Sequence, residues 1–183
     1  MITNIFHNDI VKILTIFSIS PGSRFLRKEL QEKTKMNNVN LDNALNLLLN
    51  SQILIKKGKL LFLNLEESRN LISIISNDYK KLKELPLTIY FSIISLTFYL
   101  SKIKEVKLYL FGSYAKLIFK ENSDIDLLII SDKLNKKEIN LQIDKIESRY
   151  KTKIETHYFG ESFFNNKKDS LVKEILRNGV RLI

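Results

Sequence analysis

Two carboxylates and a Gly-Ser pair lie within one short stretch, residues 108–130, LYLFGSYAKLIFKENSDIDLLII. Asp124 and Asp126 stand at the head of an apolar run. Because side chains alternate along a strand, both carboxylates should project from the same face. Two such charges repel each other by about a kcal/mol or more at an effective dielectric of about 20. A hard divalent cation relieves this repulsion, and Mg²⁺ typically takes one or two carboxylates together with water and phosphate oxygens.

The Gly-Ser pair ends the preceding apolar run at Gly112 and Ser113. Glycine lets a phosphate approach the backbone closely, and a helix that begins near Ser113 would offer unpaired N–H groups to an anion. A phosphate at residues 112–113 and a metal ion at Asp124 and Asp126 are the parts of a nucleotidyl-transfer site.

An apolar strand, Gly-Ser, ten residues and then Asp-apolar-Asp-apolar resembles the signature of the DNA polymerase β-like nucleotidyltransferase superfamily, in its small, minimal branch. The resemblance covers residues 104–160, and the order of domains is similar to that of small archaeal proteins of this type. It implies that Gly112 and Ser113 hold the triphosphate of a nucleotide and that Asp124 and Asp126 bind Mg²⁺.

The turn itself departs from the family pattern. Members commonly read Gly-Ser-x-Ala-Arg-Gly, whereas this chain reads Gly-Ser-Tyr-Ala-Lys-Leu at 112–117. Lys116, the candidate phosphate ligand in place of Arg, keeps the charge but loses the bidentate fork. Leu117 replaces a second glycine, which would either narrow the space near the phosphates or lengthen the helix.

The resemblance also implies a third carboxylate on a neighbouring strand, which completes the metal site and can deprotonate the attacking hydroxyl. The alternating segment KIETHYF, residues 153–159, predicts such a strand, and Glu155 is its candidate for this catalytic and metal-binding role. Members usually carry Asp there. The extra methylene of Glu would displace the oxygen by about an ångström, an error that costs about 10²-fold in rate. The alternative is a solvated residue of an edge strand, and His157 on the same face is open to the same two interpretations.

The composition limits the size of the core and the kinds of site that the chain can form. With 183 residues, 44% hydrophobic and 27% charged, the chain can bury one substantial core or two small ones. The absence of cysteine excludes disulfides, two histidines argue against a zinc site, and no leader segment is visible, so we expect a cytoplasmic protein. The stretch 85–101 has no charge for seventeen residues, but it is shorter than the ~20 residues of a membrane span. We therefore expect no membrane contact there, but a buried helix between the domains that also offers a homodimer contact.

The first sixty-five residues predict a winged helix-turn-helix. A helix at 10–19 stops at Ser-Pro-Gly, a short helix follows at 25–35, and apolar residues fit a third helix from Val39. The segment ILIKKGKLLFLNL, residues 53–65, predicts a hairpin around Lys57-Gly58, the wing.

The net charge of +10 is densest in this part, where residues 1–64 carry nine Lys and Arg against four Asp and Glu. This pattern favours contact with a polyanion, here double-stranded DNA. The third helix would read bases, since Asn can pair with adenine, and basic residues would bind phosphates. The candidate DNA-binding residues are Arg24, Arg27, Lys28, Asn38, Asn40, Asn43, Lys56, Lys57 and Lys59. The third helix carries no Arg or Lys, so a docking or dimerisation module remains the alternative.

The sequence therefore predicts an α/β (α+β) protein in three parts: a winged helix-turn-helix at 1–65, connecting helices at 66–103 and a small mixed-sheet nucleotidyltransferase domain at 104–183. The predicted activity is Mg²⁺-dependent transfer of a nucleoside monophosphate from a nucleoside triphosphate to a hydroxyl of a protein, nucleic acid or small molecule. The alternative is a non-catalytic DNA-binding regulator, or an antitoxin whose nucleotidyltransferase domain only binds nucleotide or a toxin-like protein partner.

Overall fold

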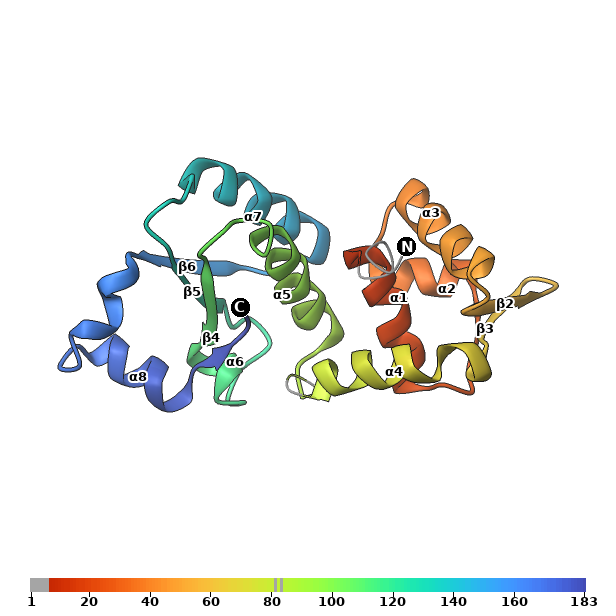
Figure 1. The fold of residues 1–183 in the computed structure, drawn as a ribbon, viewed down its shortest axis with the longest axis horizontal. Helices are drawn as coiled ribbons and strands as arrows, with labels where there is room; N and C mark the ends of the chain where they lie inside the picture. Colours follow the sequence, from red (N-terminus) through yellow and green to blue (C-terminus); the bar gives the residue numbers. More distant parts are fainter. Residues whose placement is uncertain (1–6, 81, 83) are drawn as a thin grey trace. The chain divides into compact units, whose positions relative to one another are not determined.

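The computed structural model describes residues 7–80, 82 and 84–183 (Figure 1). The chain divides into two compact units, Met1–Lys83 and Glu84–Ile183. Residues 81 and 83 of the predicted connecting helices lie outside the described part of the chain.

The first unit combines helices with a small antiparallel sheet. Strand β3 is central and pairs antiparallel with both β1 and β2. The elements, in chain order, are α1 (Asn8–Ile19), β1 (Arg24–Leu26), α2 (Arg27–Thr34), α3 (Asn38–Asn50), β2 (Leu54–Lys57), β3 (Leu60–Leu63) and α4 (Leu65–Lys80). Its core contains fully buried Ile13, Leu14 and Phe17 of α1, a helix that contacts α2, α3 and α4.

The hairpin predicted at 53–65 is confirmed, with β2 and β3 paired around a turn that contains Gly58. The prediction of a helix from Phe25 was wrong at its start. Residues 24–26 are instead a strand, because Arg24, Phe25 and Leu26 pair with β3, and α2 begins at Arg27. Tertiary pairing of this kind overrides local helix preference.

The second unit is built on a four-stranded sheet in the order β6-β5-β4-β7. Strands β5 and β6 are parallel, whereas β4 is antiparallel to both β5 and β7. The elements are α5 (Leu87–Leu100), β4 (Lys107–Phe111), α6 (Gly112–Ala115), β5 (Ile125–Ile130), α7 (Lys136–Tyr150), β6 (Ile154–Phe159), the 3₁₀ helix η2 (Glu161–Asn165), α8 (Ser170–Asn178) and β7 (Val180–Arg181).

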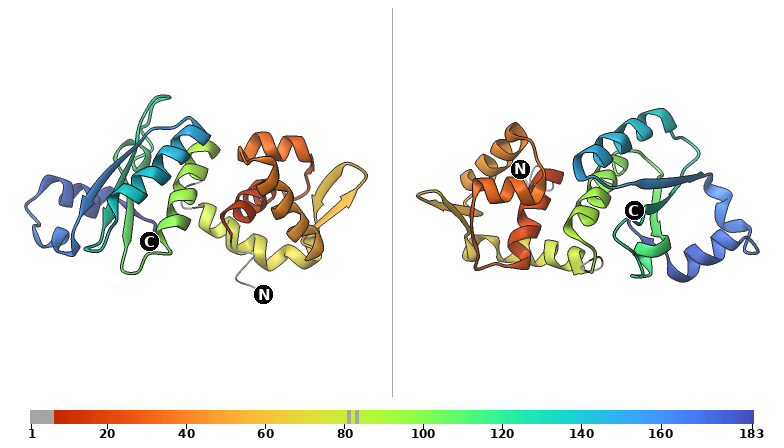
Figure 2. Two further views of the ribbon diagram at one scale, coloured as in Figure 1. Left: turned by 90° about the horizontal axis from the view of Figure 1, so that it is seen from above. Right: turned by 180° about the vertical axis from the view of Figure 1, so that it is seen from behind.

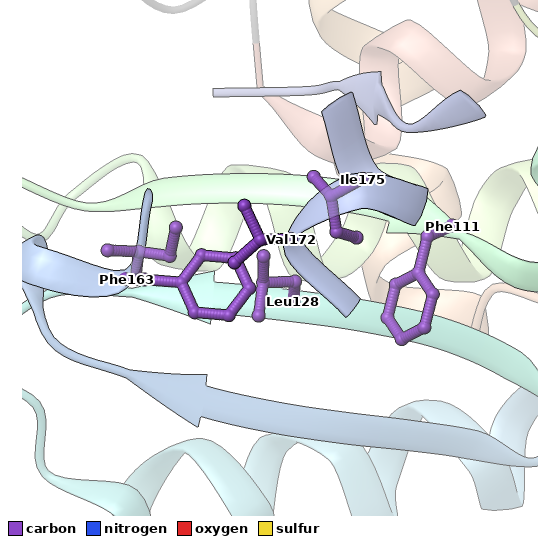
Figure 3. Close-up of a cluster of buried hydrophobic side chains, with 6 residues drawn as sticks. Phe111, Leu128, Phe163, Val172 and Ile175 are labelled. Carbon is purple, nitrogen blue, oxygen red and sulfur yellow. The ribbon is translucent and has the colours of Figure 1, made fainter. Parts of the chain in front are cut away.

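Helices cover both faces of this sheet. Helices α5 and α7 pack on each other on one side, and η2 and α8 lie on the other (Figure 2). On the latter side Phe111 and Leu128 of the sheet meet Phe163, Val172 and Ile175 in a buried cluster (Figure 3). This burial holds the ends of β4 and β5, where the candidate site lies, on a packed core.

The uncharged helix α5 is buried, as predicted from its sequence. Its polar side chains donate to carbonyls of their own helix: Ser92 to Thr88 at 2.8 Å, Ser95 to Phe91 at 2.7 Å and Thr97 to Ile93 at 2.8 Å. Within the described residues, no helix combines the length and apolar character needed to cross a membrane.

The apolar periodicity of residues 162–178 predicts one closing helix with Leu176 on its core face, but the structure divides this segment into two pieces. η2 ends at Asn165 and α8 begins only at Ser170. The reason is local: the carboxylate of Asp169 accepts from the backbone N–H groups of Leu171 and Val172, which makes it the N-cap of a new helix. Leu176, predicted to face the core, is 63% exposed.

Candidate functional site

The Gly-Ser turn lies directly against one of the predicted carboxylates. Strand β4 ends at Phe111, whose register partner on β5 is Asp126. Gly112 has φ +68°, and a Cβ atom on it would lie 1.9 Å from Oδ2 and 2.6 Å from Cγ of Asp126. Both the left-handed backbone and the close approach require glycine here.

Negative charge gathers around Asp126. Burial, first, and the nearby charge of Glu155, second, raise the pKa of the Asp126 carboxyl, and Asp124 raises it further. A backbone hydrogen bond from Ser113 and the charge of His157 act in the opposite direction. Glu155 is the register neighbour of Asp126 on the parallel strand β6, so the sheet brings these two carboxylates to one face. The combined effect is an anionic spot that a cation would stabilise.

Asp124 has a cationic partner already. Its Oδ2 accepts from Nζ of Lys153 at 2.8 Å, and this hydrogen bond raises the pKa of the lysine. The carbonyl of Lys153 accepts from the N–H of Ile125 at 2.8 Å, which fixes the lysine beside the two aspartates. Sequence reasoning missed Lys153, because only the pairing of β6 with β5 reveals its position.

Glu155 and His157 lie next to each other on β6. His157 Nε2 is 3.4 Å from Glu155 Oε1, and the ring of His157 contacts Phe111 edge-on at 5.5 Å. The predicted shared face of these two residues is therefore confirmed. Among residues 7–80, 82 and 84–183, no three His, Asp or Glu side chains are gathered as ready-made metal ligands. The metal site of Asp124, Asp126 and Glu155 stays a prediction.

Lys116, the predicted phosphate ligand, is paired with α8. Its Nζ lies 2.5 Å from Oε1 of Glu174, and both side chains are about one-third exposed. This ion pair joins the Gly-Ser turn to the helix that covers the same face of the sheet. Sequence reasoning also missed Glu174, which no local pattern links to the turn.

Leu117 has a left-handed backbone, the conformation that favours glycine. Its φ is +58°, and its side chain is 52% exposed. Helix α6 ends at Ala115, so Leu117 does not lengthen the helix. A position whose backbone suits glycine is thus occupied by a residue that adopts this conformation only at a cost.

We expect Leu117→Gly to stabilise the second unit by up to about 1 kcal/mol, because it removes the cost of a left-handed non-glycine residue. Equilibrium unfolding in urea measures this change. Leu117→Ala is the matched control, since it removes the exposed side chain but keeps the backbone cost. Equal stability of the glycine and alanine variants would contradict the explanation.

The predicted DNA-binding residues lie in the first unit and have different surroundings. Lys56, Lys57 and Lys59 are exposed on the hairpin, and Asn43 is exposed on α3. Lys28 lies 3.9 Å from Glu32, and the guanidinium of Arg24 lies 5.8 Å from the ring centre of Phe62.

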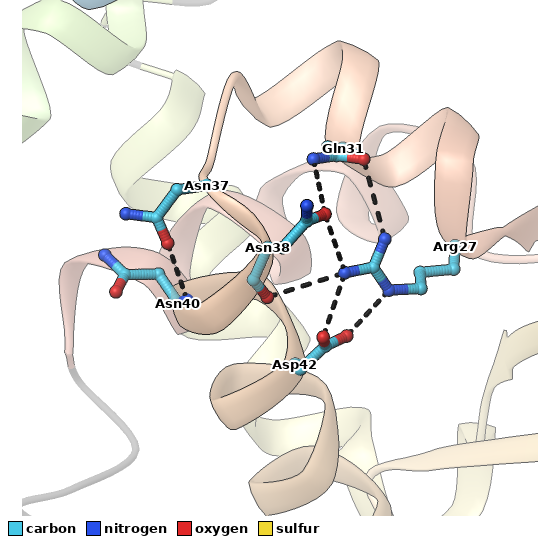
Figure 4. Close-up of polar contacts among 6 residues, drawn as sticks. All are labelled: Arg27, Gln31, Asn37, Asn38, Asn40 and Asp42. Atoms are coloured by element: carbon cyan, nitrogen blue, oxygen red, sulfur yellow. Dashed lines mark hydrogen bonds and ion pairs between the residues drawn. The ribbon is translucent and has the colours of Figure 1, made fainter.

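Arg27 is held by a polar network between α2 and α3 (Figure 4). Its Nε donates to Asp42 Oδ1 at 2.6 Å, and its Nη2 donates to Asp42 Oδ2 at 3.0 Å. The same Nη2 donates to Asn38 Oδ1 at 3.0 Å, and Asn38 Oδ1 also accepts from Gln31 at 2.8 Å. Arg27 lowers the pKa of Asp42 through this hydrogen bond. The network engages two predicted DNA-binding residues, Arg27 and Asn38, within the unit itself. Asn40 donates its backbone N–H to Asn37, the N-cap of α3.

A comparison with known protein families finds a match within the second unit. Residues 95–182 match the family model described as "Nucleotidyltransferase domain". This match supports a nucleotidyltransferase of the polymerase β-like type for this part of the chain. No curated protein matches the chain.

Proposed function

We propose, on the premise of a nucleotidyltransferase domain at residues 95–182, that this protein transfers a nucleoside monophosphate from a nucleoside triphosphate to a hydroxyl group, and that the transfer depends on Mg²⁺. The observation that carries the proposal is the contact of Gly112 with Asp126. It places the turn proposed to hold phosphates beside the carboxylate proposed to hold the metal.

The donor set fits Mg²⁺. The side chains around the turn offer carboxylate oxygens, the ligands that this ion prefers. Burial, first, and the neighbouring charge of Glu155, second, raise the pKa of Asp126, and a bound cation would offset both effects. Asp124 and Asp126 would hold the ion, with Glu155 as the third ligand. An ion held by these carboxylates would supply positive charge to stabilise the charge that develops on the transferred phosphate.

In the proposed step, the acceptor hydroxyl oxygen forms a bond to the α-phosphorus, and the bond from that phosphorus to the α,β-bridging oxygen breaks. Pyrophosphate is the leaving group, and Glu155 takes the proton of the hydroxyl. The backbone of Gly112 and Ser113 positions the triphosphate, and Lys116 binds its charge. The acceptor is a hydroxyl of a protein, a nucleic acid or a small molecule.

A second candidate is a non-catalytic domain that binds a nucleotide or a toxin-like partner, in a regulator or antitoxin. The ion pairs of the site favour it. Asp124 is already bound to Lys153 and Glu155 lies beside His157, so two of the three proposed metal ligands have partners from the chain itself.

For the first unit we propose a winged helix-turn-helix module. The order of α1, β1, α2, α3 and the β2–β3 hairpin, with a three-stranded antiparallel sheet, supports this assignment. Modules of this kind contact nucleic acid through the third helix and the wing. Double-stranded DNA is accordingly one proposed partner.

Isothermal titration with ATP, CTP, GTP and UTP, each with Mg²⁺, tests the nucleotide site. We expect micromolar binding of at least one nucleotide, and loss of that binding in the Asp124→Ala/Asp126→Ala double variant. Such a result would also choose the nucleotide for acceptor assays. If none of the four binds, the transfer mechanism as stated fails. Binding without turnover on any acceptor would favour the second candidate.

A further inference from the structure

The first unit carries a groove between the start of α2, the exposed side of α3 and the β2–β3 hairpin. Its volume is about 480 Å³. Leucines form its floor, among them Leu45 and Leu49 of α3 and Leu61 of β3, and three lysines lie along it, Lys28, Lys56 and Lys59. The groove is therefore apolar at its base and positively charged at its edges.

One arginine and one aspartate line this groove, and their charges offset each other. Arg27 and Asp42 both line it, and they form the two-pronged hydrogen-bonded pair seen in Figure 4. Lys28 lies 3.9 Å from Glu32 of its own helix, so Lys56 and Lys59 remain as the net charge of the groove. Neither Lys56 nor Lys59 forms an ion pair with any residue that the structure describes. A partner with acidic side chains would supply the missing counter-charges.

The leucine floor favours a protein helix over DNA as the partner of this groove. DNA offers protein little apolar surface besides the thymine methyl group, so a groove lined with leucines gains little from it. Helix α3, which would read the bases, has no cation, and the one arginine at its side is bound to Asp42. An amphipathic helix of a protein fills such a groove with apolar side chains at positions i, i+3 or i+4, and i+7.

We propose that this groove binds an acidic amphipathic helix of a partner protein, with its apolar side chains on the leucine floor and its carboxylates against Lys56 and Lys59. The proposal concerns the first unit alone. It therefore stands or falls independently of nucleotidyl transfer at the second unit.

The hairpin offers a matched pair of lysines for the test. Lys56 pairs with Leu61 in register and lines the groove, whereas Lys57 pairs with Leu60 and does not line it. Successive side chains of a strand point to opposite faces, which accounts for the difference. All three hairpin lysines are exposed, so charge reversal there should leave the fold intact.

The probe is a random peptide library displayed on phage, with peptides of about 16 residues, or about four helical turns. It is selected on the full-length protein at about 0.3 M salt, where weak surface attraction is screened. We expect enrichment of sequences with apolar residues at helical spacing flanked by Asp and Glu. The affinity of a selected, fluorescein-labelled peptide is then measured by anisotropy. It should fall at least about tenfold for Lys56→Glu/Lys59→Glu and less than about twofold for Lys57→Glu.

Three results would overturn the proposal. The first is a selection that yields no acidic amphipathic sequences. The second is a selected peptide whose affinity is insensitive to Lys56→Glu/Lys59→Glu, or as sensitive to Lys57→Glu. The third is mixed-sequence duplex DNA that displaces the peptide at lower concentration than unlabelled peptide does, with an affinity that falls steeply with salt; the surface would then belong to nucleic acid. Circular dichroism of each variant confirms that the unit is folded.

Discussion

Asp126→Asn is expected to abolish nucleotidyl transfer and, at the same time, to stabilise the folded protein. Asparagine has the same shape and still accepts the backbone hydrogen bond of Ser113, but it cannot provide a negative ligand. Metal-assisted charge stabilisation contributes several kcal/mol, and about 1.4 kcal/mol is tenfold in rate, so the loss should reach about 10³-fold.

The stabilisation follows from the raised pKa of Asp126. A carboxyl with a pKa above its value in the unfolded chain binds its proton more tightly when folded. The free energy of unfolding therefore falls as the pH rises from the pKa of the unfolded chain through the higher pKa of the folded protein. Asparagine avoids this cost at neutral pH. The thermal midpoint of the variant should exceed that of the parent near pH 7, and the difference should vanish below about pH 3, where Asp is protonated in both states.

Asp144→Asn is the matched control, because Asp144 is an exposed carboxylate of α7. As an exposed surface substitution, it should leave both the transfer rate and the thermal midpoint near pH 7 unchanged. A lower thermal midpoint for Asp126→Asn near pH 7 would mean that the carboxylate supports the fold, and the assignment of Asp126 to a metal site would lose its physical basis.

Gly112→Ala should lower both the free energy of unfolding and the rate of nucleotidyl transfer. The methyl group would overlap the carboxylate of Asp126, and alanine also resists the left-handed backbone. We expect a loss of at least about 2 kcal/mol in the free energy of unfolding. The carboxylate must also move by about an ångström, an error that costs about 10²-fold in transfer rate.

Two other glycines serve as controls that separate the cost of the left-handed backbone from the cost of the overlap with Asp126. Gly58 has φ +61° but no atom within 4 Å of the place where a methyl group would lie, whereas Gly22 has neither a left-handed φ nor such a neighbour. Gly58→Ala should therefore cost about 1 kcal/mol, the backbone cost alone, and Gly22→Ala should cost nothing or stabilise slightly. If Gly112→Ala lowers the free energy of unfolding no more than Gly58→Ala does, the close contact with Asp126 contributes nothing to the effect.

Local sequence patterns located much of the site. The turn at Gly112 and Ser113 follows β4, and Asp124 and Asp126 lie at the head of β5, as the alternation of apolar residues predicted. Helix α7 spans Lys136–Tyr150, the segment in which Ile139, Ile143 and Ile146 recur at helical spacing and predict a helix. Signals of this kind are local, so the sequence carries them directly.

The partners of the site residues escaped prediction because they are distant in sequence. Nothing near Asp124 points to Lys153, and nothing near Lys116 points to Glu174; packing of β6 and α8 brings each pair together. The same limit applies to the first unit, where the Arg27–Asp42 pair depends on how α2 packs on α3. The division of the closing helix escaped prediction for a different reason: the apolar periodicity runs across the break, and only the structure shows that Asp169 caps a new helix.

The turn that follows β4 has a consequence for motion at the site. Two of its backbone hydrogen bonds are long, 3.3 Å from Lys116 N–H to the carbonyl of Gly112 and 3.3 Å from Leu117 N–H to that of Tyr114, whereas Ile118 N–H donates to Ser113 at 3.0 Å. Leu117 adds backbone cost at the end of the same turn. Segments with weak hydrogen bonds and exposed side chains open at a small fraction of the global unfolding free energy. The end of the turn at Leu117 can thus adjust around a ligand, while buried Tyr114 anchors the turn and β5 keeps Asp126 in place.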